Sequence, residues 1–286
     1  MSSAVQPPHV VVVDAVTRAL TEDLVPLGDL TSALLPPGLT ASAAFVARQP
    51  GVVAGVACVA ETFRQIDGSV TLEWSLDDGD PVLAGGVIAT ATGSLASILT
   101  AERTALNFLG HLSGIATKTR AFVDAAALCG PARIWDTRKT TPGLRALEKA
   151  AVRAGGGANH RGNLSDWILL KDNHIALFGI TEAVEKARAM WPARTVHVEC
   201  DRIDQVREAL AAGADALLLD NMTADEVANC VAAADAAPQR PLLEVSGGVT
   251  LDTVGTYAAV GVDCISIGGL TNAAPVLDIG LDIDPA

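Results

Sequence analysis

The sequence predicts an α/β protein with parallel strands, and three observations support that class. From about residue 130 onward, short apolar runs alternate with segments of helical periodicity. The connections between these runs are too long for hairpins, which implies parallel strands joined by right-handed crossovers. Half of the residues are apolar but only 3% are aromatic, so the core must consist mainly of Ala, Val, Leu and Ile. Such a composition favours buried strands covered by Ala-rich helices.

Six apolar runs in the second half of the chain are the expected strands. They lie at residues 132–135, 167–170, 195–198, 214–219, 242–245 and 263–267. Between them, Thr223 and Glu226 have the spacing of a capping box at a helix start. Asp201 is the expected cap of the helix that ends near Gly213, and Pro142 suits the first turn of the helix that ends at Gly155. Repeated units of this kind fit either a barrel or a doubly wound sheet.

The first hundred residues show a different pattern. Half-buried strands are expected at 41–48, 70–74 and 87–90, separated by Gly, Pro and an acidic turn. A long helical pattern follows from about residue 97 to 128. We therefore expect two domains with a boundary near residue 110. The first covers 1–110 and the second 111–272, and a tail at 273–286 would pack on the first.

The charge distribution indicates an anionic ligand. The chain has a net charge of −13, yet residues 103–171 contain 11 Lys and Arg against 4 Asp and Glu, an excess of +7. A pI near 4.7 argues against binding to DNA or RNA, because no long basic face is available to neutralise phosphates. Cations gathered in one segment of an acidic chain suit the capture of a small, highly charged anion in a cleft.

Cysteine usage and hydropathy predict a cytoplasmic protein without a membrane span. The five cysteines are widely spaced and form no CxxC pair, so reduced thiols are a better interpretation than disulfides or metal ligands. The apolar run at residues 10–13 is followed by Asp14 and preceded by no basic region, which is atypical of a signal peptide. No uninterrupted apolar segment is long enough to cross a bilayer.

Charged residues follow most of the predicted strands on their C-terminal side. In a parallel barrel these positions converge on one rim, where active sites lie. The cations expected at this rim are Arg138, Lys139, Arg161 and Lys171. Each could be a solvated surface charge, but together they would repel one another unless an anion or neighbouring carboxylates accompanied them.

Carboxylates and glycine turns complete the expected rim. Glu199 and Asp220 could hold Mg²⁺ or stabilise positive charge on a substrate, or they could simply pair with the cations. The turns at 246–248 and 268–269 could place backbone amides against a phosphate, although paired glycines are also common in ordinary turns. His160 could hydrogen-bond a substrate, although structural histidines are commoner.

Linked motifs along nearly the whole chain resemble one known family. They are GDLTS at 28–32, ARQPG at 47–51, AERTALN at 101–107, HLSGIAT at 111–117, DTRKT at 136–140, GGGANHR at 155–161, KDNH at 171–174 and LDN at 219–221. In order and spacing they are similar to those of quinolinate phosphoribosyltransferases, also called carboxylating nicotinate-nucleotide pyrophosphorylases.

The resemblance implies an N-terminal α/β sandwich and a C-terminal open α/β barrel, assembled as a homodimer or as a higher oligomer of dimers. It implies that quinolinate and phosphoribosyl pyrophosphate (PRPP) react with Mg²⁺ to give nicotinate mononucleotide, pyrophosphate and carbon dioxide, a step of NAD biosynthesis. The implied quinolinate ligands are Arg138, His160, Arg161, Lys171 and, from across the dimer interface, Arg103. Lys139 would lie between the substrates, and Glu199 and Asp220 would contact the ribose or its metal. The 5′-phosphate would be bound by Ser246, Gly247, Gly248, Gly268 and Gly269.

Three positions depart from the family pattern: Asn272 where His is common, the order Gly162-Asn163, and Ala150 where an aromatic residue is frequent. One alternative is an enzyme of the same fold that acts on nicotinate or belongs with metal-transport operons. Another is a non-catalytic sensor of pyridine carboxylates or phosphosugars. An acceptor with two carboxylates needs more cations than one with a single carboxylate. The combination of Lys139, Glu199 and Asp220 favours catalysis, because a binding protein has little use for acids beside an anion.

Overall fold

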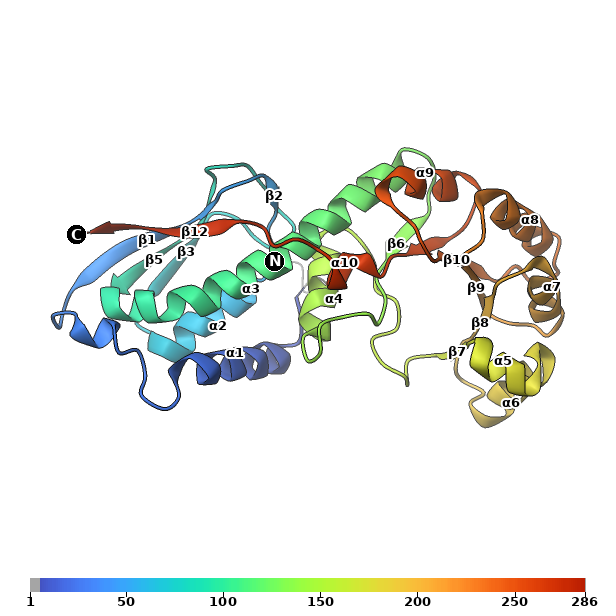
Figure 1. Cartoon of the computed structure of the whole chain (residues 1–286), viewed down its shortest axis with the longest axis horizontal. Helices are drawn as coiled ribbons and strands as arrows, with labels where there is room; N and C mark the ends of the chain where they lie inside the picture. Colours follow the sequence, from blue (N-terminus) through green and yellow to red (C-terminus); the bar gives the residue numbers. More distant parts are fainter. Residues whose placement is uncertain (1–5, 286) are drawn as a thin grey trace. The chain divides into compact units, whose positions relative to one another are not determined.

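The computed structural model describes residues 6–285, which fall into two compact units (Figure 1). The first unit comprises Met1–Arg120, Lys139–Gly156 and Gly269–Ala286, and the second comprises Ala121–Arg138 and Gly157–Gly268. The boundary expected near residue 110 therefore lies within α3 (Leu95–Ala127), a single helix that begins in one unit and ends in the other. The division also differs from the expected one in assigning residues 139–156 to the first unit.

Helix packing explains why this internal segment joins the first unit. Its helix α4 (Arg145–Ala154) contacts α1 (His9–Leu24) and α10 (Gly269–Asn272). The end of α4 also lies directly against α3, because a Cβ added at Gly155 would be 2.5 Å from the carbonyl oxygen of Ala116. A sequence pattern predicts where α4 lies in the chain but not which helices it contacts. Pro142 precedes the first residue of α4 by three positions, so it lies before the helix and not in its first turn.

The first unit is built on an antiparallel sheet with the strand order β12-β1-β5-β3. Its strands are β1 (Thr40–Ala47), β3 (Thr71–Trp74), β5 (Val87–Ser94) and β12 (Ile279–Pro285). Strands β2 (Gly51–Val52) and β4 (Pro81–Val82) form a separate two-stranded sheet. A short turn of helix spans Ser32–Leu34. The expected strands at 41–48, 70–74 and 87–90 correspond to β1, β3 and β5. The end of the predicted tail forms β12, which pairs with β1 along its length.

One apolar layer joins this sheet to its helices. Burial alternates along β1, as expected for a strand with one face in a core. The buried face packs with α2 (Val56–Asp67) and the first half of α3, so that a helical layer covers a sheet. The rings of Phe45 in β1 and Phe63 in α2 meet edge to face, with 6.1 Å between their centroids. This arrangement is the α/β sandwich that the sequence predicted.

The second unit contains a parallel sheet of six strands in the order β6-β11-β10-β9-β8-β7. The strands are β6 (Arg133–Trp135), β7 (Ile168–Leu170), β8 (Val196–Cys200), β9 (Ala216–Asp220), β10 (Leu242–Ser246) and β11 (Cys264–Ser266). Each of the six predicted runs is therefore a strand. Within residues 6–285, no pairing joins β6 to β7, so the sheet is an open barrel and does not close.

Helices follow the strands of this sheet, as the crossover pattern predicted. They are α5 (Asp172–Phe178), α6 (Ile180–Met190), α7 (Ile203–Ala211), α8 (Ala224–Asp235) and α9 (Leu251–Ala259). Thr223 and Glu226 form the predicted capping box, in which the Glu226 amide donates to the Thr223 hydroxyl at 3.3 Å. The expectation for Asp201 was wrong, because Arg202 occupies the N-cap of α7 and no side-chain hydrogen bond caps that helix.

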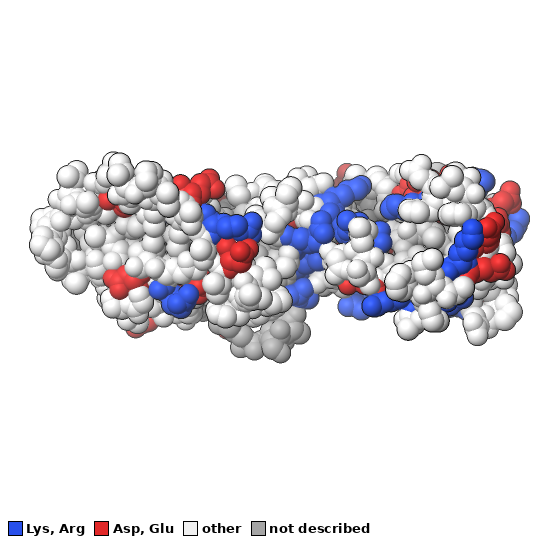
Figure 2. Space-filling model, turned by 90° about the horizontal axis from the view of Figure 1, so that it is seen from below, with Lys and Arg blue, Asp and Glu red and all other residues white. Residues whose placement is uncertain are grey.

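Charged side chains of both signs lie on the face shown in Figure 2. Some basic side chains there lie beside acidic ones, and others gather without acidic neighbours. Exposed ion pairs of this type include Arg48 with Asp282 and Lys186 with Glu182. Among the described residues, no helix is both long and apolar enough to span a membrane.

Candidate active site

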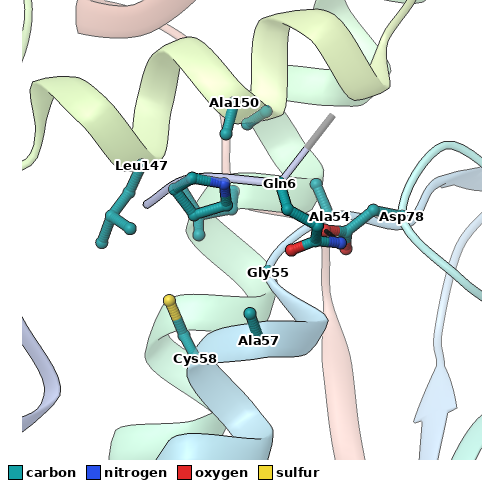
Figure 3. Close-up of a pocket in the computed structure, with 11 residues that line it drawn as sticks. Gln6, Ala54, Gly55, Ala57, Cys58, Asp78, Leu147 and Ala150 are labelled. Carbon is teal, nitrogen blue, oxygen red and sulfur yellow. Dashed lines mark hydrogen bonds between the residues drawn. The ribbon is translucent and has the colours of Figure 1, made fainter. Parts of the chain in front are cut away.

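The first unit contains one small cavity, shown in Figure 3, which is too small for a substrate. Its volume is about 10 Å³, the space of roughly one water molecule. Gln6 and Asp78 line it, and the Gln6 side-chain amide donates to the Asp78 carboxylate at 2.9 Å. Burial raises the pKa of Asp78, although hydrogen bonds from Val56 and Gln6 act in the opposite direction. We therefore interpret this cavity as a small gap where packed segments meet, and not as a ligand site.

The parallel sheet of the second unit places polar side chains on one of its faces. Glu199 of β8 and Glu244 of β10 are both in register with Leu218 of β9, and Asp220 is in register with Ser246. Because alternate residues of a strand point to the same side, these side chains project from a common face. Asp220 and Ser246 are the last residues of their strands, as expected for the rim of a parallel barrel.

The opposite face of the same strands is apolar and fully buried. Val198, Leu219 and Val245 lie there, each no more than 1% exposed. Helices α6 and α7 contact β8, and α9 contacts β11. This outer layer holds the strands in register, so the inner face does not have to supply the apolar core.

Lys171 and Glu199 form an ion pair between neighbouring strands. Lys171 directly follows β7 and its ammonium group donates to the carboxylate of Glu199. Lys171 is 45% exposed and Glu199 only 14%, so the pair lies at the margin of the interior. Pairing of acids with cations was one of the two interpretations that the sequence left open for Glu199. The structure shows this pairing for Glu199.

Arg138 and Arg161 lie close enough for their charges to interact. Burial lowers the pKa of Arg161, and the positive charge of Arg138 lowers it further, while Asp166 and Glu244 oppose the change. The Arg161 guanidinium donates to the backbone oxygen of Trp167 at 3.4 Å, but its Nε has no hydrogen-bond partner within residues 6–285. Two guanidinium groups side by side, one of them buried, favour an anion between them.

Asp136 fixes the segment that carries His160 and Arg161. Its buried carboxylate accepts the backbone amide of His160 at 2.8 Å and the side-chain amide of Asn159 at 2.7 Å. A carboxylate that accepts two hydrogen bonds from a second segment holds that segment in place without depending on a ligand. Asp136, the first residue of the DTRKT motif, therefore has a structural role. The sequence did not separate this role from that of the cations that follow it in the motif.

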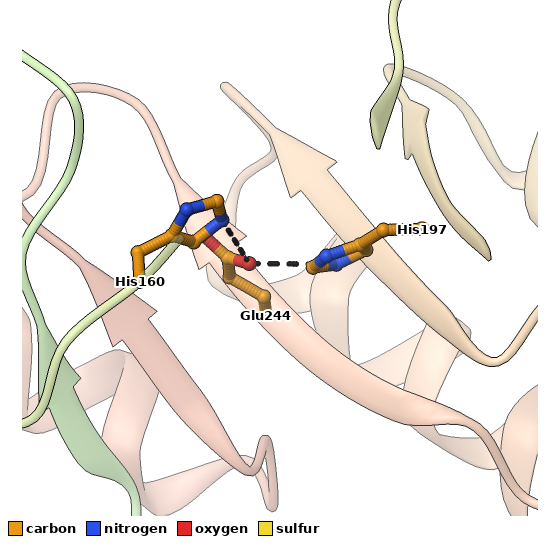
Figure 4. A group of neighbouring side chains, drawn as sticks. All are labelled: His160, His197 and Glu244. Carbon is orange, nitrogen blue, oxygen red and sulfur yellow. Dashed lines mark ion pairs between the residues drawn. The ribbon is translucent and has the colours of Figure 1, made fainter. Parts of the chain in front are cut away.

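His160, His197 and Glu244 form a buried cluster, shown in Figure 4. The Nε2 atoms of both histidines lie 3.4 Å from Oε2 of Glu244, and Ser266 donates to the other oxygen, Oε1. Burial lowers the pKa of His197 to about 4, so its imidazole is neutral at pH 7. Burial alone would raise the pKa of Glu244, but the neighbouring histidines and Ser266 keep it below its usual range.

Two indole rings surround His160 in this cluster. The imidazole lies 5.8 Å from the Trp135 ring and 4.9 Å from the Trp167 ring, measured between centroids. Neither indole N–H has a hydrogen-bond partner among the described residues. The sequence analysis identified His160 but gave no role to His197 or to the tryptophans. The only available signal for His197 was a basic residue in the middle of an apolar strand.

The glycine turn after β10 has a fixed shape. Gly247 has φ +97°, and a Cβ there would lie 2.9 Å from the backbone nitrogen of Asn221. That nitrogen donates to the Ser246 carbonyl at 2.9 Å, while the Asn221 side chain donates to Asp220 at 2.7 Å. Gly248 has φ +61° and open space around its Cα. The turn is thus packed against the end of β9 on one side and open on the other.

The remaining predicted site residues belong to the first unit. Arg103 is exposed on α3, and Gly269 begins α10. Lys139 is exposed, and its carbonyl oxygen accepts a hydrogen bond from Thr271 at 2.7 Å. Gly268 ends the second unit. The structure thus groups Arg138, His160, Arg161, Lys171, Glu199, Asp220, Ser246, Gly247, Gly248 and Gly268 within one unit. The approach of Lys139, Arg103 and Gly269 to them stays a prediction.

Known proteins provide an independent comparison. The family models for the N-terminal and C-terminal domains of quinolinate phosphoribosyl transferase match residues 29–113 and 115–282. The carboxylating nicotinate-nucleotide pyrophosphorylase of Mycobacterium leprae is 42% identical, over 94% of this chain and 96% of its own. A probable enzyme of the same name from Bacillus subtilis is 44% identical, over 90% of this chain and 88% of its own.

Solved structures agree with the sequence comparison. The nicotinate-nucleotide pyrophosphorylase of Francisella tularensis superposes with a TM-score of 0.92 at 36% identity, covering 98% of both chains. That of Ehrlichia chaffeensis superposes with a TM-score of 0.90 at 39% identity, covering 95% of this chain and 98% of its own. Both family models, both kinds of relative and the paired sandwich and open barrel lead to one conclusion: this chain belongs to the quinolinate phosphoribosyltransferase family.

Proposed function

We propose that this chain is a pentosyltransferase that joins the phosphoribosyl group of PRPP to the ring nitrogen of quinolinate. The products are nicotinate mononucleotide, pyrophosphate and carbon dioxide. Two observations carry the proposal in a family member that spans both domains: the interacting charges of Arg138 and Arg161, and the ion pair of Lys171 with Glu199. A doubly charged pyridine needs several cations, and its sugar partner needs acids close by.

The quinolinate site would use the buried guanidinium of Arg161 together with Arg138, His160 and Lys171. A carboxylate placed beside Arg161 would relieve its interaction with Arg138 and engage the Nε donor, which has no protein partner among the described residues. We propose that Arg103 of the partner subunit completes this site in a homodimer. The indoles of Trp135 and Trp167 would restrict water and orient the flat ring.

Substrate binding would also change the state of Glu199. In the structure, Glu199 forms an ion pair with Lys171. A quinolinate carboxylate that engages Lys171 would compete for the same ammonium group and release Glu199. The freed carboxylate, together with Asp220, could then stabilise positive charge on the ribose as its bond to pyrophosphate breaks. The acid that pairs with Lys171 would thus become available when the acceptor is bound.

The leaving pyrophosphate requires its own compensation. We propose that Mg²⁺ accompanies PRPP and that Glu199 and Asp220 are the residues able to hold it, because both offer oxygen ligands at neighbouring strand ends. When bound, this ion would offset charge on the pyrophosphate. Lys139 would act on the same group from its exposed position. The amides of 246–248 and 268–269 would receive the 5′-phosphate, with Gly248 on the open side of its turn.

Attack by the pyridine nitrogen on C1′ forms the new C–N bond and leaves a positively charged ring. That ring can accept the electron pair of the adjacent C–C bond when the neighbouring carboxylate departs as carbon dioxide, and a proton then takes its place. The contribution of the protein is to orient two mutually repelling anions.

A cytoplasmic location fits the five free thiols of the chain.

The decisive experiment compares acceptors. Purified protein is incubated with PRPP and Mg²⁺ and is given quinolinate or nicotinate in separate reactions. Nucleotide formation and release of carbon dioxide are followed together. We expect both products from quinolinate and neither from nicotinate. Nucleotide from nicotinate alone would assign the chain to the alternative acceptor, and binding without turnover of either compound would support the sensor.

A further inference from the structure

The buried cluster of His160, His197 and Glu244 has a property that the proposed reaction does not explain. The three residues are 7%, 2% and 0% exposed, and they come from three separate segments of the second unit. Figure 4 shows both imidazoles turned toward one carboxylate. Their nearest ligand atoms all lie within 4.8 Å of one another.

Two buried polar atoms of the cluster face each other without a hydrogen bond. Nε2 of His197 has no hydrogen-bond partner among the described residues. Oε2 of Glu244, 3.4 Å away, also has none there. Burying such atoms without partners is costly, and a metal ion between them would satisfy both.

The distances suit a metal ion coordinated by nitrogen and oxygen. Bonds of about 2.0–2.1 Å in a tetrahedral site separate neighbouring ligand atoms by about 3.4 Å. Both Nε2 to Oε2 separations in the cluster have that value. Ser266 holds the second oxygen of Glu244, which directs the first toward the histidines, as outer hydrogen bonds commonly do at metal centres. The nearby guanidinium of Arg161 opposes a cation, and the carboxylate offsets it.

We propose that Nε2 of His160, Nε2 of His197 and Oε2 of Glu244 together bind one divalent transition-metal ion, Zn²⁺ in the first instance. Two imidazoles and one carboxylate favour zinc over magnesium, which prefers oxygen ligands. The site is therefore separate from any Mg²⁺ that accompanies PRPP. It would tie β8 and β10 to the segment that carries His160 and Arg161, and would leave a fourth position for water or an anion.

Zinc binding by the full chain tests the proposal directly. Protein freed of metal with a chelator is titrated with Zn²⁺ against a coloured competing chelator, with Mg²⁺ in excess to occupy sites made only of oxygen. We expect one Zn²⁺ per chain. His197→Gln and Glu244→Gln should each weaken binding by more than about 100-fold, the upper range for changes outside the first ligands. His9→Gln, at an exposed histidine in α1, is the matched control and should bind like the wild type.

Two further readouts make the outcome independent of how the variants fold. Zinc-edge X-ray absorption of the loaded wild type should show two imidazole ligands, and Zn²⁺ should raise the melting temperature of the wild type. The melting temperature of His197→Gln should not respond. A wild type that binds no stoichiometric Zn²⁺, a bound zinc without imidazole ligands, or equal affinity in His197→Gln would each overturn the site. The cluster would then be held together by protons alone.

Discussion

The two sheets of this protein bury their inner faces with opposite chemistry. In the antiparallel sheet of the first unit, the buried face consists of residues such as Phe45, Ile88 and Ala89, which pack on helices. In the parallel sheet of the second unit, the corresponding face carries Glu199 and Glu244. The difference shows that the inner face of a sheet need not be apolar. The inner face of the first sheet stabilises its unit. The inner face of the second holds polar groups, because the apolar face on its other side supplies the buried apolar surface.

The polar face would be costly by itself. A buried carboxylate such as Glu244 stabilises a fold only when donors satisfy it, and removing one partner leaves an uncompensated charge. The apolar side chains on the other face of β8, β9 and β10 supply the burial that the inner face lacks. This contrast leads to predictions in which cations of the second unit govern substrate capture and the core of the first unit governs stability, with Arg103 of the first unit as the exception.

The largest expected effect is loss of quinolinate capture when the second unit loses two cations. The double variant Arg161→Ala, Lys171→Ala should lower kcat/KM for quinolinate by roughly 10⁴-fold, because each truncated charge partner costs about 2–5 kcal/mol. The KM for PRPP should change far less. Steady-state kinetics with each substrate varied in turn measures both.

Arg240 provides the matched control in the same unit. It pairs with Asp235 and Asp263 and lies just before β10, at the opposite end of the strand from Ser246. Arg240→Ala should leave kcat/KM within a factor of about two, as expected for a partly exposed ion pair. Unchanged quinolinate kinetics in the double variant would remove the basis for the proposed clamp.

The next effect concerns stability in the first unit. Phe45→Ala removes a fully buried ring that meets Phe63, and should lower the free energy of unfolding by about 3–5 kcal/mol. The activity of each folded molecule should be unchanged. Urea unfolding and active-site titration separate the two quantities. A quinolinate KM raised as much as in the cation variant would show that the contrast between the units is wrong.

The sequence predicted the strands well because apolar runs and their spacing depend on local chain geometry. Lys171 and Glu199 could be predicted to meet because both lie at the C-terminal ends of strands of one parallel sheet. The role of His197 could not, since an apolar run does not reveal which face each residue takes until the register is known. The assignment of α4 to the first unit was also out of reach, because it depends on contacts with α1 and α10 that lie far away in the sequence.

A smaller effect tests whether each site combines the second unit of one chain with the first unit of its partner. If Arg103 of the partner subunit contributes to each site, Arg103→Ala and Arg161→Ala will each be nearly inactive. Mixing them under conditions that exchange subunits should restore about a quarter of the wild-type sites, because half of the dimers are mixed and each mixed dimer has one intact site. Recovery is measured by kcat per chain. Absence of recovery despite proven exchange would place Arg103 in its own subunit's site or outside any site.

The smallest effect concerns a carboxylate of the first unit with three hydrogen-bonding partner residues, two of them near it in the sequence. Asp29 accepts hydrogen bonds from the amides of Thr31 and Ser32 at 3.0 Å each, from the Ser32 hydroxyl, and from Thr100 at 2.9 Å. The Ser32 bonds are the main reason that its pKa falls from 3.8 to about 2. Because the folded pKa is lower than the unfolded one, the ionised carboxylate stabilises the protein above pH 3.8, and this contribution is lost as the pH falls toward 2.

Asp29→Asn should therefore be less stable than the wild type at pH 7, by less than about 1 kcal/mol after solvent screening. The difference should shrink as the pH falls from about 5 to 2. Urea midpoints measured across that range give both values, with Asp14→Asn, at an exposed residue of α1, as the control. A difference that grows at low pH would mean that Asp29 is protonated more easily in the folded chain. The hydrogen bonds from Thr31, Ser32 and Thr100 would then fail to stabilise its ionised form, and this carboxylate would not add to the stability that the contrast assigns to the first unit.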